Sequence, residues 1–278
     1  MRILAVAVLL AATASPAVEP QPSAGCAREA IEHGRRLVKK IDVAGTSREV
    51  ILDVPDSVKP GTPAPVLLDF HGFGHSGAGV WNVSGFKTLA ERDGFITAYP
   101  EGLPIHLTLR GEEVDGAGWQ MDAVADNRDV AFTTALLDQL ERDYCVDHRR
   151  VYSTGFSNGA FFSQVLACAL SGRIAAVAPV SGGTLRFDCK PARPVPILIQ
   201  NGSEDELIPV ASARETRDRW KTLNGCTGDA TPDGPACQRW TECRGGATVE
   251  YCEEAYGHRW QPQATDRVWT FLSNKTLP

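Results

Sequence analysis

The residues best suited to catalysis lie in the pentapeptide Gly-Phe-Ser-Asn-Gly at positions 155–159. A β-branched and aromatic run at 150–154 predicts a strand before it, and an apolar run at 160–167 predicts a helix after it. A Gly-x-Ser-x-Gly pattern between a strand and a helix is typical of a nucleophile elbow, whereas the bare pattern is too common to carry meaning. The glycines lack a Cβ atom, which permits a sharp turn. We therefore expect Ser157 to be a nucleophile.

A serine hydroxyl is a weak nucleophile and needs a base, usually a histidine that a carboxylate orients. In hydrolases with such an elbow, the chain order is serine, acid, histidine. His258 is the only histidine after Ser157, so we expect it to be the base. A predicted strand at 195–200 ends in an acidic loop, where we choose Asp205 as the acid. The alternatives in that loop are Glu204 and Glu206, and all three could instead be solvated charges or a helix cap.

The oxyanion formed during acyl transfer needs preorganised hydrogen-bond donors. One expected donor is the backbone N–H of Asn158, at the start of the elbow helix. The other should come from the loop His-Gly-Phe-Gly-His at 71–75, which follows a predicted strand. We favour the N–H of Phe73, with Gly74 as the alternative.

Histidines four residues apart, such as His71 and His75, could bind a metal if they lay on a helix. The glycines beside them make a helix unfavourable here, so we expect no metal. Catalysis by a serine, a histidine and an acid needs no cofactor, and we expect none. We expect His71 to order the loop by hydrogen bonds. Trp119 and Trp260 are candidates to line the substrate cleft. For Trp119, ordinary packing in the core is the alternative. For Trp81, core packing is the favoured interpretation.

Strand-like and helix-like segments alternate along the chain, which predicts an α/β fold. The expected architecture is a mostly parallel twisted sheet with helices on both faces. The predicted strands are at 48–54, 66–70, 95–99, 150–154, 174–180 and 195–200. The predicted helices are at 80–91, 127–144, 160–167, 209–223 and 266–274.

Two connections bear on the cleft. The long loop at 101–126 is rich in glycine and charge and should lie at the carboxyl edge of the sheet, where open α/β folds bind ligands. The connection at 181–194 is short and leaves no room for a helical lid domain, so we expect an open cleft.

The length of 278 residues and the net charge of -6 narrow the class of protein. One catalytic domain at 26–278 would bury enough surface to fold alone, and we expect a monomer. The sequence has no long basic run, which argues against nucleic acid or an anionic membrane as the main partner.

The N-terminal residues carry targeting features. A short basic start and an apolar run predict a signal peptide at 1–17, followed by a proline-rich linker at 18–25, and therefore secretion to the extracellular space. The residues Ser-Ala-Gly-Cys at 23–26 have a weak likeness to a lipoprotein box, which leaves lipidation as an alternative.

Eight cysteines behind a signal peptide predict up to four disulfides. Short strands predicted at 238–241 and 247–251 form a hairpin that would bring Cys237 opposite Cys252 and leave Cys243 for Cys226. Cys168 and Cys189 could join the elbow helix to the loop after the next strand, and Cys26 with Cys145 follows by exclusion. The chain has no Cys-x-x-Cys pattern, which argues against a zinc ribbon.

The whole set of motifs resembles the secreted esterases of carbohydrate esterase family 1, the family of feruloyl esterases and polyhydroxybutyrate depolymerases. The matching stretches are at 23–26, 71–72, 99–102, 129–132, 155–159, 224–226 and 257–260. This resemblance implies an α/β-hydrolase fold and a Ser–Asp–His triad on Ser157, Asp205 and His258. Two departures leave the substrate open: Asn201 stands where the family has histidine, and Arg259 where it has threonine.

We therefore expect a secreted serine carboxylic ester hydrolase that acts on a small or oligomeric ester. Feruloyl or acetyl esters of plant polysaccharide are the favoured substrates, because no module for binding an insoluble polymer follows the last predicted helix. The alternative substrate is a polyhydroxybutyrate-type polyester. A non-catalytic binding protein on a hydrolase scaffold is the other class of function, although all three triad positions are filled.

Overall fold

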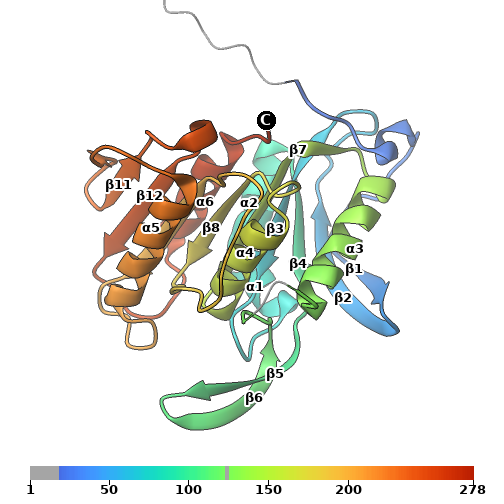
Figure 1. The fold of residues 1–278 in the computed structure, drawn as a ribbon. Helices are drawn as coiled ribbons and strands as arrows, with labels where there is room; N and C mark the ends of the chain where they lie inside the picture. The colour runs from blue at the N-terminus through green and yellow to red at the C-terminus, as the bar shows by residue number, and fades with distance from the viewer. Residues whose placement is uncertain (1–18, 123–124) are drawn as a thin grey trace, which may run out of the picture.

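The computed structural model describes residues 19–122 and 125–278, so the predicted signal peptide at 1–17 lies outside the described residues. Its central feature is a sheet of ten strands in the order β1-β2-β4-β3-β7-β8-β9-β12-β11-β10 (Figure 1). The six strands from β4 to β12 in this order run parallel, and the strands at both edges are antiparallel. The strands are β1 Gly34–Val43, β2 Thr46–Val54, β3 Ala64–Phe70, β4 Ile96–Pro100, β7 Val146–Phe156, β8 Ala176–Val180, β9 Ile197–Gly202, β10 Thr231–Pro232, β11 Cys237–Trp240 and β12 Val249–Glu254.

Helices cover both faces of this sheet. The helices are α1 Gly77–Val83, α2 Phe86–Asp93, α3 Arg128–Asp143, α4 Asn158–Ala169, α5 Val210–Asn224 and α6 Pro262–Ser273, with short 3-10 turns at Ala24–Ala27 and Arg244–Gly246. One core lies under α3, α4 and α5, with Phe132, Phe162 and Trp220 fully buried, and the other lies under α2 and α6 (Figure 1). On the second face Trp269 of α6 stacks on Phe95 at 3.7 Å between ring centroids. The predicted α/β class is confirmed.

The helix predicted at 80–91 and one edge of the sheet differ from the sequence prediction. The helix predicted at 80–91 is broken into α1 and α2, because Gly85 adopts φ +78° between them and turns the chain. Strand β1 was not predicted; it pairs with β2 at the edge of the sheet and alternates exposed with partly buried residues.

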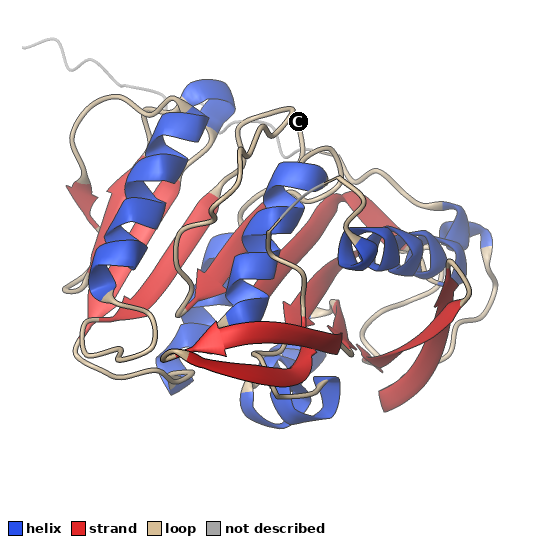
Figure 2. Cartoon of the chain, turned by 60° about the horizontal axis from the view of Figure 1, so that its bottom comes forward, coloured by secondary structure: helices blue, strands red, loops and turns tan. Residues whose placement is uncertain are grey.

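The loop predicted at 101–126 contains a β-hairpin of β5 Leu103–Leu109 and β6 Glu112–Gly118. Its tip is a two-residue turn in which Arg110 has φ +53° and Gly111 has φ +85°, the signs that a type I′ turn requires. The hairpin forms a separate sheet and projects from the carboxyl edge of the main sheet (Figures 1 and 2). Its base packs on the loop after β3, since a Cβ on Gly116 would lie 2.9 Å from the Phe73 ring.

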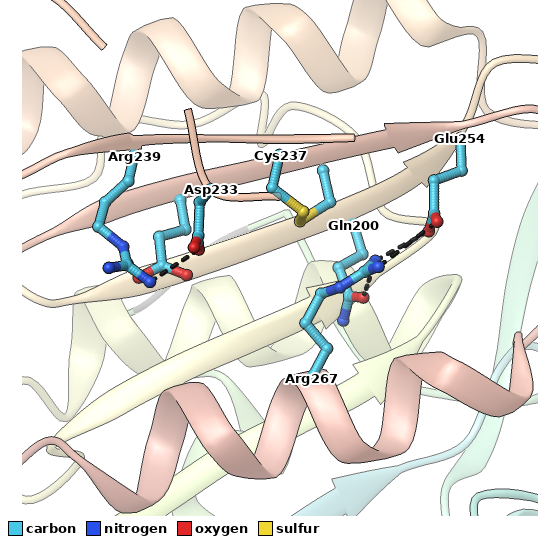
Figure 3. The surroundings of a disulfide bond; sticks show 8 residues. Gln200, Asp233, Cys237, Arg239, Glu254 and Arg267 are labelled. Atoms are coloured by element: carbon cyan, nitrogen blue, oxygen red, sulfur yellow. Dashed lines mark hydrogen bonds and ion pairs between the residues drawn. A yellow bond between two sulfur atoms is a disulfide. The ribbon is translucent and has the colours of Figure 1, made fainter. Parts of the chain in front are cut away.

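The structure joins the same four pairs of cysteines that the sequence predicts, Cys26–Cys145, Cys168–Cys189, Cys226–Cys243 and Cys237–Cys252. The last pair links directly opposed positions of β11 and β12. Figure 3 shows this disulfide between two ion pairs, Arg239 with Asp233 at 2.7 Å and Arg267 with Glu254 at 2.8 Å. Arg267 belongs to α6, so its ion pair connects α6 to β12, while the disulfide connects β12 to β11.

The part of the predicted linker that the structure describes is attached to the domain. The backbone N–H of Gln21 donates to Asp147 and that of Ser23 donates to the Val146 carbonyl. A Cβ on Gly25 would lie 2.0 Å from the Tyr144 carbonyl oxygen, so this segment is tightly packed. The sulfur of Cys26 is engaged with Cys145, which leaves no thiol for a lipid anchor.

Two observations concern the cleft and the surface. Between β8 and β9 the chain forms bends and irregular backbone, and residues 181–196 contain no helix. Within the described ranges, each helix is too short or too polar to cross a lipid bilayer.

A buried carboxyl group on β3 makes the stability of the fold depend on pH. The side chain of Asp69 is fully buried. This burial raises its pKa from 3.8 to about 7, against a smaller lowering by the neighbouring Ser84 hydroxyl. Because the folded state holds this proton more tightly than the unfolded state, the stabilisation is complete below the unfolded pKa and is lost as the pH rises through about 7.

We therefore expect the free energy of unfolding to fall between about pH 4 and about pH 7, and to fall less in the variant Asp69→Asn, which cannot ionise. Urea unfolding of both proteins at a series of pH values checks this. An unchanged slope in Asp69→Asn would rule out Asp69 as the source.

Candidate active site

Ser157 occupies a strained turn between β7 and α4. Its backbone has φ +53° and ψ -116°, a conformation that residues with a side chain rarely adopt. A Cβ on Gly155 would lie 2.7 Å from the Phe70 carbonyl oxygen, and one on Gly159 would lie 2.1 Å from the same atom. The two glycines therefore let the turn and the start of α4 lie directly against the end of β3. This is the geometry of a nucleophile elbow.

Asp205 and His258 form a hydrogen-bonded pair. The Nδ1–H of His258 donates to Asp205 Oδ2 at 2.7 Å, and the Asp205 carboxylate is completely buried. Its other oxygen accepts from the backbone N–H groups of Leu207 and Ile208 at 2.9 and 2.8 Å, which fixes the carboxylate in place. The alternatives Glu204 and Glu206 are exposed. The geometry thus favours Asp205 among the three acids.

The parallel pairing of β9 with β12 brings these two residues together. Asp205 follows β9, and His258 follows β12, so both lie at the carboxyl edge of neighbouring strands. The two loops touch closely, because a Cβ on Gly202 would lie 1.9 Å from the Tyr256 carbonyl oxygen. The imidazole of His258 lies 4.7 Å from the Phe156 ring, between ring centroids, beside the elbow.

Ser157 and His258 line one hollow of about 480 Å³, which we call the hairpin hollow. Strand β5 forms one wall with Leu107 and Leu109, and the acid loop forms another with Leu207 and Ile208. The hollow is bounded further by Phe73, Asn158 and Phe161. A volume of this order suits a ligand larger than a few atoms.

The expected oxyanion donors lie beside the serine. Asn158 is the first residue of α4, where a backbone N–H has no partner within the helix. Phe73 lines the same hollow, and within residues 19–122 and 125–278 no protein acceptor is found for its N–H. The N–H of Gly74 donates to the Ala117 carbonyl at 2.8 Å. This bond occupies Gly74 and favours Phe73 as the second donor.

His71 orders the loop that carries Phe73. Its Nε2 accepts from the Gly102 N–H at 2.9 Å, so the proton is on Nδ1, which donates to the Gly72 carbonyl at 2.7 Å. Burial lowers the pKa of His71 from 6.5 to about 4, and the imidazole therefore stays neutral at ordinary pH. No group of three or more His, Cys, Asp or Glu that could hold a metal is found in the described part of the chain.

Trp119 does not line the cleft, which corrects the sequence prediction. Its side chain is completely buried, and its indole N–H donates to the His71 carbonyl at 2.9 Å. Its backbone N–H donates to Asn158 Oδ1 at 2.7 Å, and its carbonyl accepts from Asn158 Nδ2 at 3.1 Å. Trp119 therefore connects the loop after β3 to the start of α4. Trp260 is partly exposed and lies beside His258 on the other side from the hairpin.

A buried ion pair behind Trp119 was not predicted. Arg48 of β2 and Asp129 at the start of α3 lie 2.8 Å apart, both almost completely buried. Asp129 also accepts from the Gln120 N–H at 2.8 Å, which anchors the segment next to Trp119. A sequence signal for strand β5 of the hairpin was available, because apolar side chains recur at every second position from Leu103 to Leu109. No local pattern brings Arg48 to Asp129.

Comparisons with known proteins add to this geometry. Residues 57–238 match the family described as Phospholipase/Carboxylesterase. Feruloyl esterase B from Piromyces equi is 30% identical over 262 residues, which cover 83% of this chain and 46% of that protein. Feruloyl esterase D from Neurospora crassa is 30% identical over 232 residues, which cover 79% of this chain and 74% of that protein. A bifunctional acetylxylan esterase/xylanase from Neocallimastix patriciarum is 24% identical, and the match covers 84% of this chain and 34% of that protein.

Solved structures share the fold. The acetyl xylan esterase from Aspergillus awamori aligns with a TM-score of 0.67 at 16% identity, over 85% of this chain and 99% of that chain. The chain spans about half the length of the feruloyl esterase B it matches and about a third of the bifunctional enzyme.

The close packing of the elbow predicts that replacing two different glycines by alanine has very different effects on the free energy of unfolding. Gly159→Ala places a methyl group against the Phe70 backbone and should lower the free energy of unfolding by about 3 kcal/mol. Gly172→Ala meets nothing within 4 Å and should change it by less than about 1 kcal/mol. Urea denaturation of both variants measures this. Equal effects would contradict the packing described for the elbow.

Proposed function

The chain belongs to the phospholipase/carboxylesterase family, and from that membership we propose that it is a serine carboxylic ester hydrolase working through an acyl-enzyme. The observation that carries the proposal is the hydrogen bond between His258 and the buried Asp205, with His258 and Ser157 lining one hollow. Serine, acid and histidine follow in the chain order of hydrolases with this elbow. The esterase family expected from the sequence is confirmed by the family match.

In the acylation step, Ser157 Oγ attacks the ester carbonyl carbon while Nε2 of His258 takes the hydroxyl proton. Asp205 accepts from Nδ1–H, so it holds the imidazole with Nε2 free to act as the base and stabilises the imidazolium that forms. The N–H groups of Phe73 and Asn158 donate to the developing oxyanion. These donors are fixed before the substrate arrives, which is the condition for effective electrostatic stabilisation.

The tetrahedral intermediate then collapses. The bond between the carbonyl carbon and the alcohol oxygen breaks, and His258 gives its proton to that oxygen, so a neutral alcohol leaves. A water molecule attacks the acyl-enzyme in the same way, with His258 again taking a proton and returning it to Ser157 Oγ. The products are a carboxylic acid and an alcohol, and the residues of the site return to their starting state.

The proposed substrates are acyl esters of plant polysaccharide, with feruloyl and acetyl groups as candidates. The support comes from relatives named feruloyl esterase and acetylxylan esterase/xylanase. We also propose that residues 26–278 form one catalytic domain, that the protein acts as a monomer, and that it is secreted. The four disulfides support an oxidising compartment.

A hydrolysis panel tests the proposal, with methyl ferulate, acetylated xylan and hydroxybutyrate oligomers as substrates. We expect release of ferulate or acetate and little product from the polyester. Preferential cleavage of the hydroxybutyrate oligomers would overturn the substrate class while keeping the reaction type. No hydrolysis of any ester would overturn the proposed function as a whole.

The acid of the triad is tested by two neighbouring substitutions. Asp205→Asn keeps the shape of the side chain but favours the wrong imidazole tautomer, so kcat should fall by about 10⁴-fold. Glu204→Gln removes an exposed charge in the same loop and should leave kcat within about twofold, as for most exposed substitutions. Steady-state kinetics on methyl ferulate or a nitrophenyl ester provide the measurement. A large loss in Glu204→Gln with little loss in Asp205→Asn would assign the acid elsewhere.

A further inference from the structure

Two hollows meet at His258. The hairpin hollow lies on one side of the imidazole, and a second hollow of about 560 Å³ lies on the other, between α1 and the segment after β12. We call the second one the α1 hollow. The two share Gly72, His75, Phe156 and His258 as lining residues. An ester also has two halves, the acyl group and the alcohol group, which extend in different directions from the ester bond. Each hollow could hold one of these halves.

The catalytic groups are distributed unequally between the two hollows. Ser157, Phe73 and Asn158 line the hairpin hollow and are not among the residues that line the α1 hollow. The acyl carbon bonds to Ser157 and its oxygen points to the two N–H donors, so this carbon must lie at the hairpin hollow. The leaving oxygen instead receives its proton from His258, the residue through which the α1 hollow is reached.

We propose that the hairpin hollow binds the acyl group and that the α1 hollow binds the leaving alcohol, an inference that rests on the proposed ester hydrolysis. It identifies two sets of residues that determine specificity independently. One set, on β5 and after the acid, selects the acid half of the ester. The other, on α1 and after His258, selects the alcohol half.

The linings differ in chemistry as this assignment requires. The hairpin hollow is walled by apolar side chains, namely Leu107, Leu109, Met121, Phe161, Leu207 and Ile208. Arg110 at the hairpin tip and Glu206 form an exposed ion pair at 3.2 Å, which links the two walls of the hollow. An apolar acyl body larger than acetyl, such as an aromatic ring, fits such a lining.

The α1 hollow combines an aromatic ring with polar groups. Trp260 is fixed by a hydrogen bond from its indole N–H to Thr265 Oγ1 at 3.0 Å and by an edge contact with the Phe86 ring. Asn82, His75 and Arg259 line the same hollow and offer hydrogen-bonding groups. A ring face with polar neighbours suits an alcohol that has both apolar and hydroxyl-bearing surfaces, which is the chemistry of a sugar.

Exposed apolar side chains provide an independent observation. Among the described residues, four large hydrophobic side chains are markedly exposed, Val38, Val83, Leu109 and Leu207. Leu109 and Leu207 line the hairpin hollow from opposite walls, and Val83 lines the α1 hollow. Three of the four thus surround the site, as expected for apolar surface kept exposed for a ligand. Val38, on β1, lines neither hollow and serves as a matched control.

The test crosses two acyl groups with two alcohols, as the methyl ester and a sugar ester of both ferulate and acetate. Leu207→Ser should lower the ratio of kcat/KM for feruloyl over acetyl esters by about tenfold, whichever alcohol is present. Val83→Ser should lower the ratio for sugar over methyl esters by about fivefold, whichever acyl group is present. Val38→Ser should change neither ratio. Each ratio is measured on one preparation, so partial unfolding of a variant does not distort it.

The opposite result overturns the assignment. If Leu207→Ser changes the alcohol preference and Val83→Ser changes the acyl preference, the two hollows have been assigned the wrong way round. If neither ratio moves in either variant, the hollows do not hold the two halves of the ester. If the wild-type protein cleaves none of the four esters, the proposed function itself fails, and this outcome is distinguishable from the other two.

Discussion

The site depends on the absence of two Cβ atoms at the turn that carries Ser157. The strained backbone of this residue, with φ +53°, is held because Gly155 and Gly159 both lie against the Phe70 carbonyl at the end of β3. This contact fixes the serine at the carboxyl edge of the central strands and brings the start of α4 to the loop after β3. A donor on α4 and a donor on that loop can therefore face one point in space. The cost of the strain is met by the packing of the surrounding elements.

Buried hydrogen bonds fix the loops around this turn. Trp119 donates to both His71 and Asn158, and His71 accepts from Gly102, so three separate segments of the chain are joined at the proposed oxyanion site. The ion pair of Arg48 with Asp129 secures the same segment from behind. A buried polar group that loses its partner is costly, so such a network has one preferred arrangement. This rigidity is what preorganised donors require.

Local pattern and chain order were enough to identify the candidate residues that the structure places at one edge of the sheet. The elbow has a motif, the acid follows a recognisable strand, and His258 was the only histidine in the required order. The same reasoning gave the disulfide across β11 and β12, because a hairpin register is local. It failed for Trp119, whose burial depends on contacts with residues about forty positions away or more. It also failed for the β5–β6 hairpin, although apolar residues recur at a period of two in β5, and for the break at Gly85.

Covalent labelling of the nucleophile tests the central claim most directly. The native protein would be treated with a fluorophosphonate, digested under non-reducing conditions, and mapped by mass spectrometry alongside residual ester hydrolysis. The account predicts a single adduct on Ser157, formed in proportion to the loss of activity and absent in Ser157→Ala. Complete labelling of another residue, or full hydrolysis by a protein in which Ser157 is replaced, would contradict it.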